Sequence, residues 1–90
     1  MESAHKERSD PRGEDRALME LVAQEHPLAR EQLVRRLLSR VRRATRALLR
    51  DPADADDATQ LCLIELLRSA ASFRGEGSLE AWSDRIVVRT

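Results

Sequence analysis

The sequence predicts an all-α fold, a compact bundle of about four helices, and three observations support this prediction. Apolar residues recur at helical spacing through most of the chain. No stretch shows the alternation of a half-buried strand. Only 2% of the residues are aromatic, so Leu, Ala and Val must build the core. A chain of 90 residues forms one domain with a thin core.

Composition and cysteine content narrow the class of protein. Apolar residues make up 41% and charged residues 36% of the chain, which is typical of a globular domain. No run approaches the roughly 18 apolar residues of a membrane span, and the first residues lack the apolar segment of a secretory signal. The single cysteine, Cys62, excludes an internal disulfide. No membrane insertion and a reducing, cytoplasmic location are therefore expected.

The formal net charge of zero conceals a block pattern. Residues 30–50 carry eight arginines and one acid, whereas residues 51–72 carry five acids and one arginine. Two interpretations are open at this point. The charges are solvated helix faces, or the molecule has two electrostatic faces that suit different partners.

The N-terminal half is expected to contain a tail and two helices. Residues 1–13 are polar and aperiodic, which indicates a flexible tail before a domain over residues 14–90. Asp15 is a candidate N-cap of the first helix, whose inner face would comprise Leu18, Leu21, Val22 and Glu25. Pro27 suits the first turn of a second helix that reaches about Arg50. The apolar stripe of that helix comprises Leu33, Leu37, Val41, Ala44 and Leu48, widened by Val34, Leu38 and Thr45.

Two further helices are expected in the C-terminal half. The third runs from near Asp54 to about Ser72, and its early aspartates complement the positive end of the helix dipole. Its segment LCLIELL is almost continuously apolar, so it is buried on several sides or docks on another molecule. Ser78 is the expected N-cap of the fourth helix. That helix meets no stop signal before Thr90, which suggests a fragment of a longer chain.

The predicted packing places the first, second and fourth helices around the third. The residues expected to be mostly buried are Leu37, Val41, Leu61, Ile64, Leu67, Trp82 and Ile86.

Catalytic and metal-binding motifs are not recognisable in the sequence. It has neither a nucleophile motif nor a glycine-rich phosphate loop, which disfavours a small all-α enzyme fragment. His5 and His26 lack partners at metal-ligand spacing, and DPADADD lacks the glycine and distal glutamate of a calcium loop. Cys62 is expected to be a small core residue. We therefore expect no enzyme activity, catalytic residue, metal or cofactor.

An ordered set of motifs over roughly residues 15–90 resembles the second conserved region of bacterial sigma-70 factors, in the extracytoplasmic-function (ECF) group. The family pattern begins with Asp-Ala-x-Asp-x-x-Gln, which here covers residues 54–60. A Phe-Arg-Gly turn follows at residues 73–75, then Leu-x-x-Trp at 79–82 and Arg-Ile at 85–86. Three positions depart from the pattern: Leu61 replaces a frequent Glu, and Ser83 and Asp84 are polar where apolar or aromatic residues are common.

The resemblance implies a transcription initiation domain with two partners. One is the β′ subunit of core RNA polymerase, whose clamp helices would contact Asp54, Asp57, Gln60 and Leu61. The other is promoter DNA, melted at its −10 element. The residues that the resemblance assigns to DNA are Phe73, Arg74, Gly75, Gly77, Ser78, Arg85 and Arg89. An anti-sigma factor is a further implied partner, and the family's −35-binding domain has no counterpart in this sequence.

Physical chemistry agrees with this assignment. Reading a melted strand requires an unstacked base in a pocket and phosphates held by Arg, Ser and backbone N–H groups. A glycine-bearing turn before a helix N-terminus supplies such donors, and Phe73 and Trp82 would anchor its two sides. The alternative is a regulatory helical adaptor that binds another protein through LCLIELL without contacting DNA. Salt-dependent binding to melted promoter DNA separates the two.

Overall fold

The computed structural model describes residues 11–90, which form four α-helices and one short 3₁₀ helix. The helices are α2 (Pro11–Ala23), α3 (Pro27–Leu48), α4 (Pro52–Arg68), the 3₁₀ helix η1 (Ala70–Ser72) and α5 (Leu79–Arg89). The all-α prediction is confirmed. Within this part of the chain, no helix combines the length and the apolarity needed to cross a membrane.

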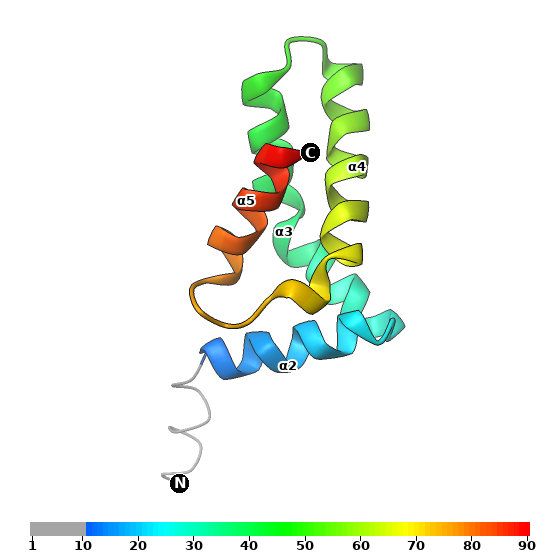
Figure 1. The fold of residues 1–90 in the computed structure, drawn as a ribbon. Helices are drawn as coiled ribbons and strands as arrows, with labels where there is room; N and C mark the ends of the chain where they lie inside the picture. The colour runs from blue at the N-terminus through cyan, green and yellow to red at the C-terminus, as the bar shows by residue number, and fades with distance from the viewer. Residues whose placement is uncertain (1–10) are drawn as a thin grey trace, which may run out of the picture.

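The helices are arranged around the pair α3 and α4, which run antiparallel side by side (Figure 1). Helix α2 crosses one end of this pair and packs on α3 and η1, and α5 packs on both α3 and α4. The sequence prediction placed α4 alone at the centre. In the structure α3 and α4 share that position, because α3 also contacts all three other helices.

Helix α2 begins at Pro11, earlier than the expected start at Glu14. Residues 1–10 of the predicted tail lie outside the described residues. Asp15 is therefore inside the helix, and its prediction as an N-cap is wrong. Glu25 ends the segment in the left-handed region, with a φ of 64°. Helix α3 then starts at Pro27 as predicted, and His26 caps it by accepting a hydrogen bond from the Ala29 N–H at 3.4 Å.

The starts of α4 and α5 are defined by side-chain caps. Asp51 caps α4 by accepting a hydrogen bond from the Ala53 N–H at 2.9 Å, and Pro52 occupies the first turn. Helix α4 therefore starts before Asp54. Ser78 caps α5 as predicted, because its Oγ accepts a hydrogen bond from the Ala81 N–H at 2.9 Å.

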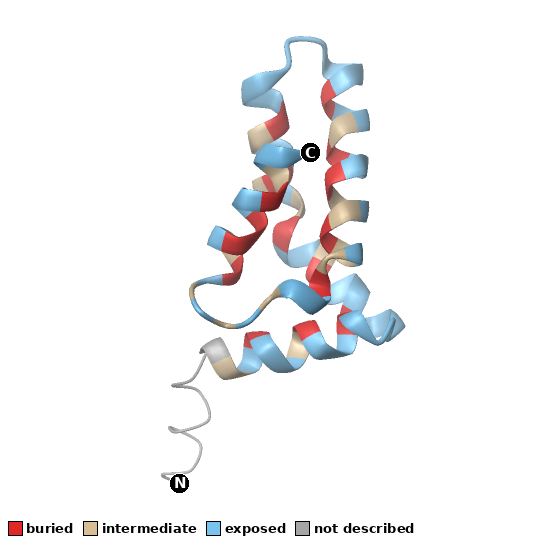
Figure 2. Ribbon diagram, viewed as in Figure 1, coloured by how far each residue is buried: buried red, intermediate tan, exposed pale blue. Residues whose placement is uncertain are grey.

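The core is a single cluster on the facing sides of the helices (Figure 2). The prediction is confirmed for four buried residues, Leu37, Val41, Trp82 and Ile86, and Leu67 is partly buried against the cluster. Cys62 is buried, as expected. Other buried members that connect the helices are Met19, Val22, Leu33, Leu66 and Leu79.

Several predicted inner-face residues are wrong. Leu61 is 59% exposed and Ile64 is 51% exposed, although both were expected in the core. The buried stripe of α4 comprises Ala55, Thr59, Cys62 and Leu66 instead. The spacing of this stripe turns Leu61 and Ile64 away from α3. Leu21, Glu25 and Leu48 are likewise exposed rather than inward-facing.

A buried pair of hydroxyls joins the central helices. The Oγ1 atoms of Thr45 on α3 and Thr59 on α4 lie 2.8 Å apart. One of these hydroxyls donates to the other, and the accepting hydroxyl donates to a carbonyl of its own helix, that of Arg42 for Thr45 or that of Ala55 for Thr59. Small side chains at this contact allow the two helices to approach closely, so the stripe needs no large apolar residue at these positions.

Candidate binding surfaces

Helix α4 presents an exposed strip opposite its buried stripe. Asp54, Asp57, Gln60 and Leu61, the predicted polymerase-binding residues, are all exposed on this helix. Asp57, Gln60, Leu61 and Ile64 are spaced three and four residues apart, so they are neighbours on its surface. We call these four residues the α4 strip. It combines a carboxylate, an amide and two large apolar side chains, which suits binding to another protein more than solvation alone.

Sequence reasoning missed Ile64 as a surface residue. The signal that could have identified it is the set of small residues Ala55, Thr59 and Cys62, whose spacing marks a close helix contact. The sequence prediction took Leu61, Ile64 and Leu67 as the inner row of the helix, whereas the structure buries Ala55, Thr59, Cys62 and Leu66.

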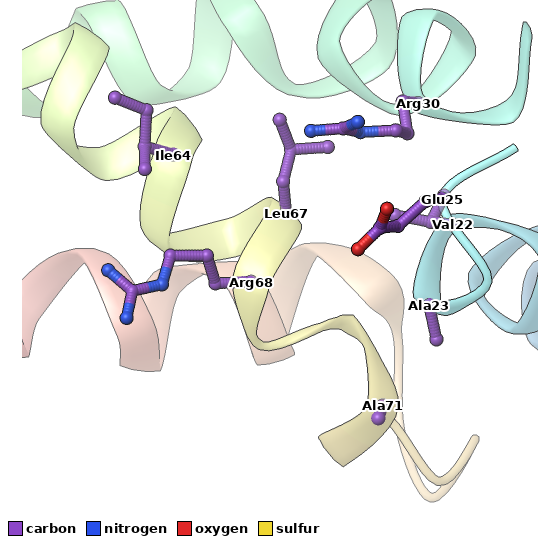
Figure 3. Close-up of a pocket in the computed structure, with 8 residues that line it drawn as sticks. All are labelled: Val22, Ala23, Glu25, Arg30, Ile64, Leu67, Arg68 and Ala71. Atoms are coloured by element: carbon purple, nitrogen blue, oxygen red, sulfur yellow. The ribbon is translucent and has the colours of Figure 1, made fainter. Parts of the chain in front are cut away.

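A pocket of about 350 Å³ lies beside the α4 strip and is shown in Figure 3. Ile64, Leu67 and Arg68 contribute to it from α4, and Arg30 from α3. Leu67 and Arg30 point into it, and the Glu25 carboxylate reaches it from the turn after α2 (Figure 3). The remaining lining residues are Val22, Ala23 and Ala71. The exposed strip thus continues into a hollow with apolar walls and charged side chains.

The second surface is the loop between η1 and α5, which is braced by two aromatic rings. Phe73 and Trp82 make an edge-to-face contact, with ring centroids 5.8 Å apart and an interplanar angle of 77°. Trp82 Nε1 donates a hydrogen bond to Ser72 Oγ at 3.1 Å, and Ser72 Oγ donates to the Ser69 carbonyl at 2.7 Å. Trp82 is buried and Phe73 is half-buried. The rings therefore close the base of the loop.

The loop borders a small hollow in the surface, with a volume of about 80 Å³. Six of the seven predicted DNA-binding residues line it: Phe73, Arg74, Gly75, Gly77, Ser78 and Arg85. The seventh, Arg89, lies one turn further along α5 and does not line the hollow. The loop residues and Arg85, from the second turn of α5, thus share one hollow.

Two ion-pair groups join the surrounding helices. Arg36 of α3 donates to both carboxylate oxygens of Asp15 in α2, at 2.6 and 3.2 Å, and to Glu80 of α5 at 3.2 Å. Arg40 donates to both oxygens of Asp84, at 2.8 and 2.7 Å. Asp84 therefore has a partner within the domain, and its charge is compensated beside the predicted DNA surface.

These contacts alter the ionisation of the groups involved. The hydrogen bonds from Arg40 lower the pKa of Asp84. Burial alone would raise the pKa of Glu80, but a backbone hydrogen bond and Arg36 outweigh it and lower the pKa. The hydrogen bond with Asp15 raises the pKa of Arg36. The carboxylates of Glu80 and Asp84 in α5 are accordingly held in their charged, paired forms.

Sequence reasoning did not identify Arg36 and Arg40 as positioning residues. The available signal is that both pairs, Arg36 with Arg40 and Glu80 with Asp84, are four residues apart. Two helices with matching spacing can align two ion pairs. Which helices face each other is nevertheless a tertiary property.

Comparisons with known proteins identify the family of the chain. The family model described as "Sigma-70 region 2" matches residues 33–90, more than half of the chain. The chain is 40% identical over 58 residues to the "ECF RNA polymerase sigma factor SigM" of Mycobacterium tuberculosis, in both the Erdman and H37Rv strains.

The matched segment is 64% of this chain and 30% of each SigM protein. The chain therefore corresponds to less than a third of those relatives. No solved structure matches at a significant level. With the motifs, the helical fold and the family match in agreement, the chain belongs to the sigma-70 region 2 family, in its extracytoplasmic-function group.

Proposed function

We propose that this domain acts in transcription initiation, by binding core RNA polymerase through α4 and by holding melted promoter DNA at the loop before α5. The observation that carries the proposal is the braced loop. Six residues of the family's DNA-binding pattern surround one hollow there, and Phe73 and Trp82 hold its base closed. Binding, rather than catalysis, is the activity that this arrangement supports.

The proposed polymerase site is the α4 strip with Asp54. Its carboxylates and amide suit basic and hydrogen-bonding groups on a partner helix, and Leu61 and Ile64 offer apolar area for burial. The β′ clamp helices are the partner that family membership suggests. The adjacent pocket at Leu67 and Arg30 extends this surface.

Docking is tested with the double variant Asp57→Ala/Gln60→Ala. Both residues are exposed, so thermal unfolding should be unchanged while affinity for a purified β′ clamp-helix fragment falls by about tenfold or more. Glu20→Ala/Gln24→Ala is the matched control, because it removes an exposed acid from α2 and an exposed amide from the turn that follows it. Equal affinities for the two double variants would contradict the assignment.

The proposed DNA site comprises residues 73–78 with Arg85 and Arg89. Arg74 supplies charge, Ser78 a hydroxyl, and the glycines allow close approach of the backbone. A captured base contributes about 1–3 kcal/mol, so the isolated domain should bind weakly and with strong salt dependence.

Chemical-shift perturbation with a short non-template −10 oligonucleotide tests the DNA site. We expect the shifts to cluster on residues 73–79 and on Arg85. Shifts confined to α3, with residues 73–79 untouched, would make the loop a simple connector. Absence of any salt-dependent binding would favour the helical adaptor, for which the exposed Leu61 and Ile64 are the supporting observation.

A further inference from the structure

Helix α2 brings a basic side chain to the loop. Figure 1 shows the N-terminal half of α2 passing beside the loop between η1 and α5. A Cβ atom placed on Gly75 would lie 2.7 Å from Cδ and 2.9 Å from Cγ of Arg16, and 3.4 Å from its Nε. The Arg16 side chain therefore lies directly against the loop backbone.

The position of Arg16 is set by its neighbours in α2. Asp15 is buried and makes the two-point ion pair with Arg36. Met19 and Val22 of the same helix are buried in the core. Because α2 is held on both sides of Arg16 in the sequence, the backbone that carries this arginine is fixed relative to the loop.

The ion pairs around the loop leave the guanidinium of Arg16 available to bind a ligand. Arg36 pairs with Asp15 of α2 and Glu80 of α5, and Arg40 pairs with Asp84 of α5. Among the described residues, Arg16, Arg74 and Arg85 have no ion pair or side-chain hydrogen bond. Glu76, an exposed acid of the loop, likewise has no ion-pair partner in that part of the chain. The loop surface therefore carries a positive excess.

We propose that Arg16 is an additional phosphate-binding residue of the loop site, where it binds the backbone of the single strand next to Gly75. Arg16 precedes residues 33–90, so the family match assigns it no role. A guanidinium is well suited to a phosphate because its N–H groups match two phosphate oxygens. The inference rests on the proposed function and extends its DNA site from one helix–loop unit to a second helix.

The test measures binding of a short fluorescent single-stranded DNA to the 90-residue chain over a series of salt concentrations. Arg16→Gln should weaken binding severalfold and reduce the slope of log affinity against log salt by about 0.7, the value for one lost phosphate contact on a single strand. Arg16→Lys should restore most of the slope, because an ammonium also binds phosphate.

Two further variants make the outcomes distinguishable. Arg46→Gln removes the same charge from the last turn of α3 and should leave the slope unchanged. Arg74→Gln reports on the loop itself. If Arg74→Gln weakens binding while Arg16→Gln matches Arg46→Gln, the role of Arg16 is refuted and the proposed function survives. If neither Arg74→Gln nor Arg16→Gln binds the DNA more weakly than Arg46→Gln does, both proposals fail.

Discussion

Gly75 and Gly77 differ in what their positions require, although both were expected among the DNA-binding residues of the same loop. Gly75 has a φ of +76°, in the left-handed region that favours glycine. Its missing side chain also leaves room for Arg16. A Cβ on Gly77 would meet nothing within 4 Å. One glycine is therefore a conformational and steric requirement, and the other is not.

Gly75→Ala should lower the free energy of unfolding by about 1–2 kcal/mol, the cost of placing a side chain in the left-handed region, with displacement of Arg16 in addition. Gly77→Ala is the matched control and should have little effect. Denaturant unfolding of both variants measures the difference. Similar midpoints for the two variants would show that the loop relaxes around Gly75 without cost.

At the scale of the element, α4 shows how one apolar segment divides between two roles. LCLIELL contributes Cys62 and Leu66 to the core, and Leu61 and Ile64 to the exposed strip. Leu63 and Leu67 pack at the border of the core. The segment is therefore buried on one face, and its docking on another molecule through the exposed face stays a prediction. The exposed face is the part that folding leaves available for a partner.

Leu66→Ala should destabilise the domain by about 2–5 kcal/mol, because Leu66 is 1% exposed and truncation leaves a cavity. Leu61→Ala, the same chemical change on the exposed side of α4, should alter the free energy of unfolding by only about 0.5 kcal/mol. It should instead weaken binding to the β′ clamp helices. Equal destabilisation by both variants, measured in denaturant, would refute this division of the helix.

At the scale of the whole molecule, ion pairs between helices orient α2 and α5 on α3. Arg36 contacts acids from both helices, and Arg40 adds the pair with Asp84. Asp84 is half-exposed, so its pair contributes little stability and is weakened by salt. Its main consequence is that the negative charge of Asp84 is compensated beside the proposed DNA site.

The pair also predicts a pH dependence. Arg40 lowers the pKa of Asp84 below its ordinary value of 3.8 in the folded state. The resulting stability is present above the unfolded-state pKa and is lost as the pH falls through the folded-state pKa. Asp84→Asn should therefore melt at a slightly lower temperature than the wild type at neutral pH, and at the same temperature in strong acid. The control variant is Glu76→Gln, which removes an exposed loop acid that has no ion-pair partner among residues 11–90. Differential scanning calorimetry at neutral and strongly acidic pH measures both variants, and an equal effect of Asp84→Asn at both pH values would contradict the prediction.

The sequence by itself determined the approximate extents of the helices, the cap at Ser78 and the family. Helical periodicity, the proline at the start of α3 and the Ser78 cap each act over only a few neighbouring residues. Local chemistry is therefore sufficient to place these features. The order of the motifs is also a property of the chain alone. This is why the all-α fold and the likeness to sigma-70 region 2 were predictable.

Only the tertiary structure decided which side of each helix is buried and which distant residues meet. Leu61 and Ile64 are as apolar as Leu66, and their exposure follows from the close contact of α3 and α4 at Thr45 and Thr59. The meetings of Asp15 with Arg36, and of Arg16 with Gly75, depend on how α2 crosses the bundle. Such contacts join residues far apart in the chain, and their geometry is set by the packing of whole helices rather than by local preference.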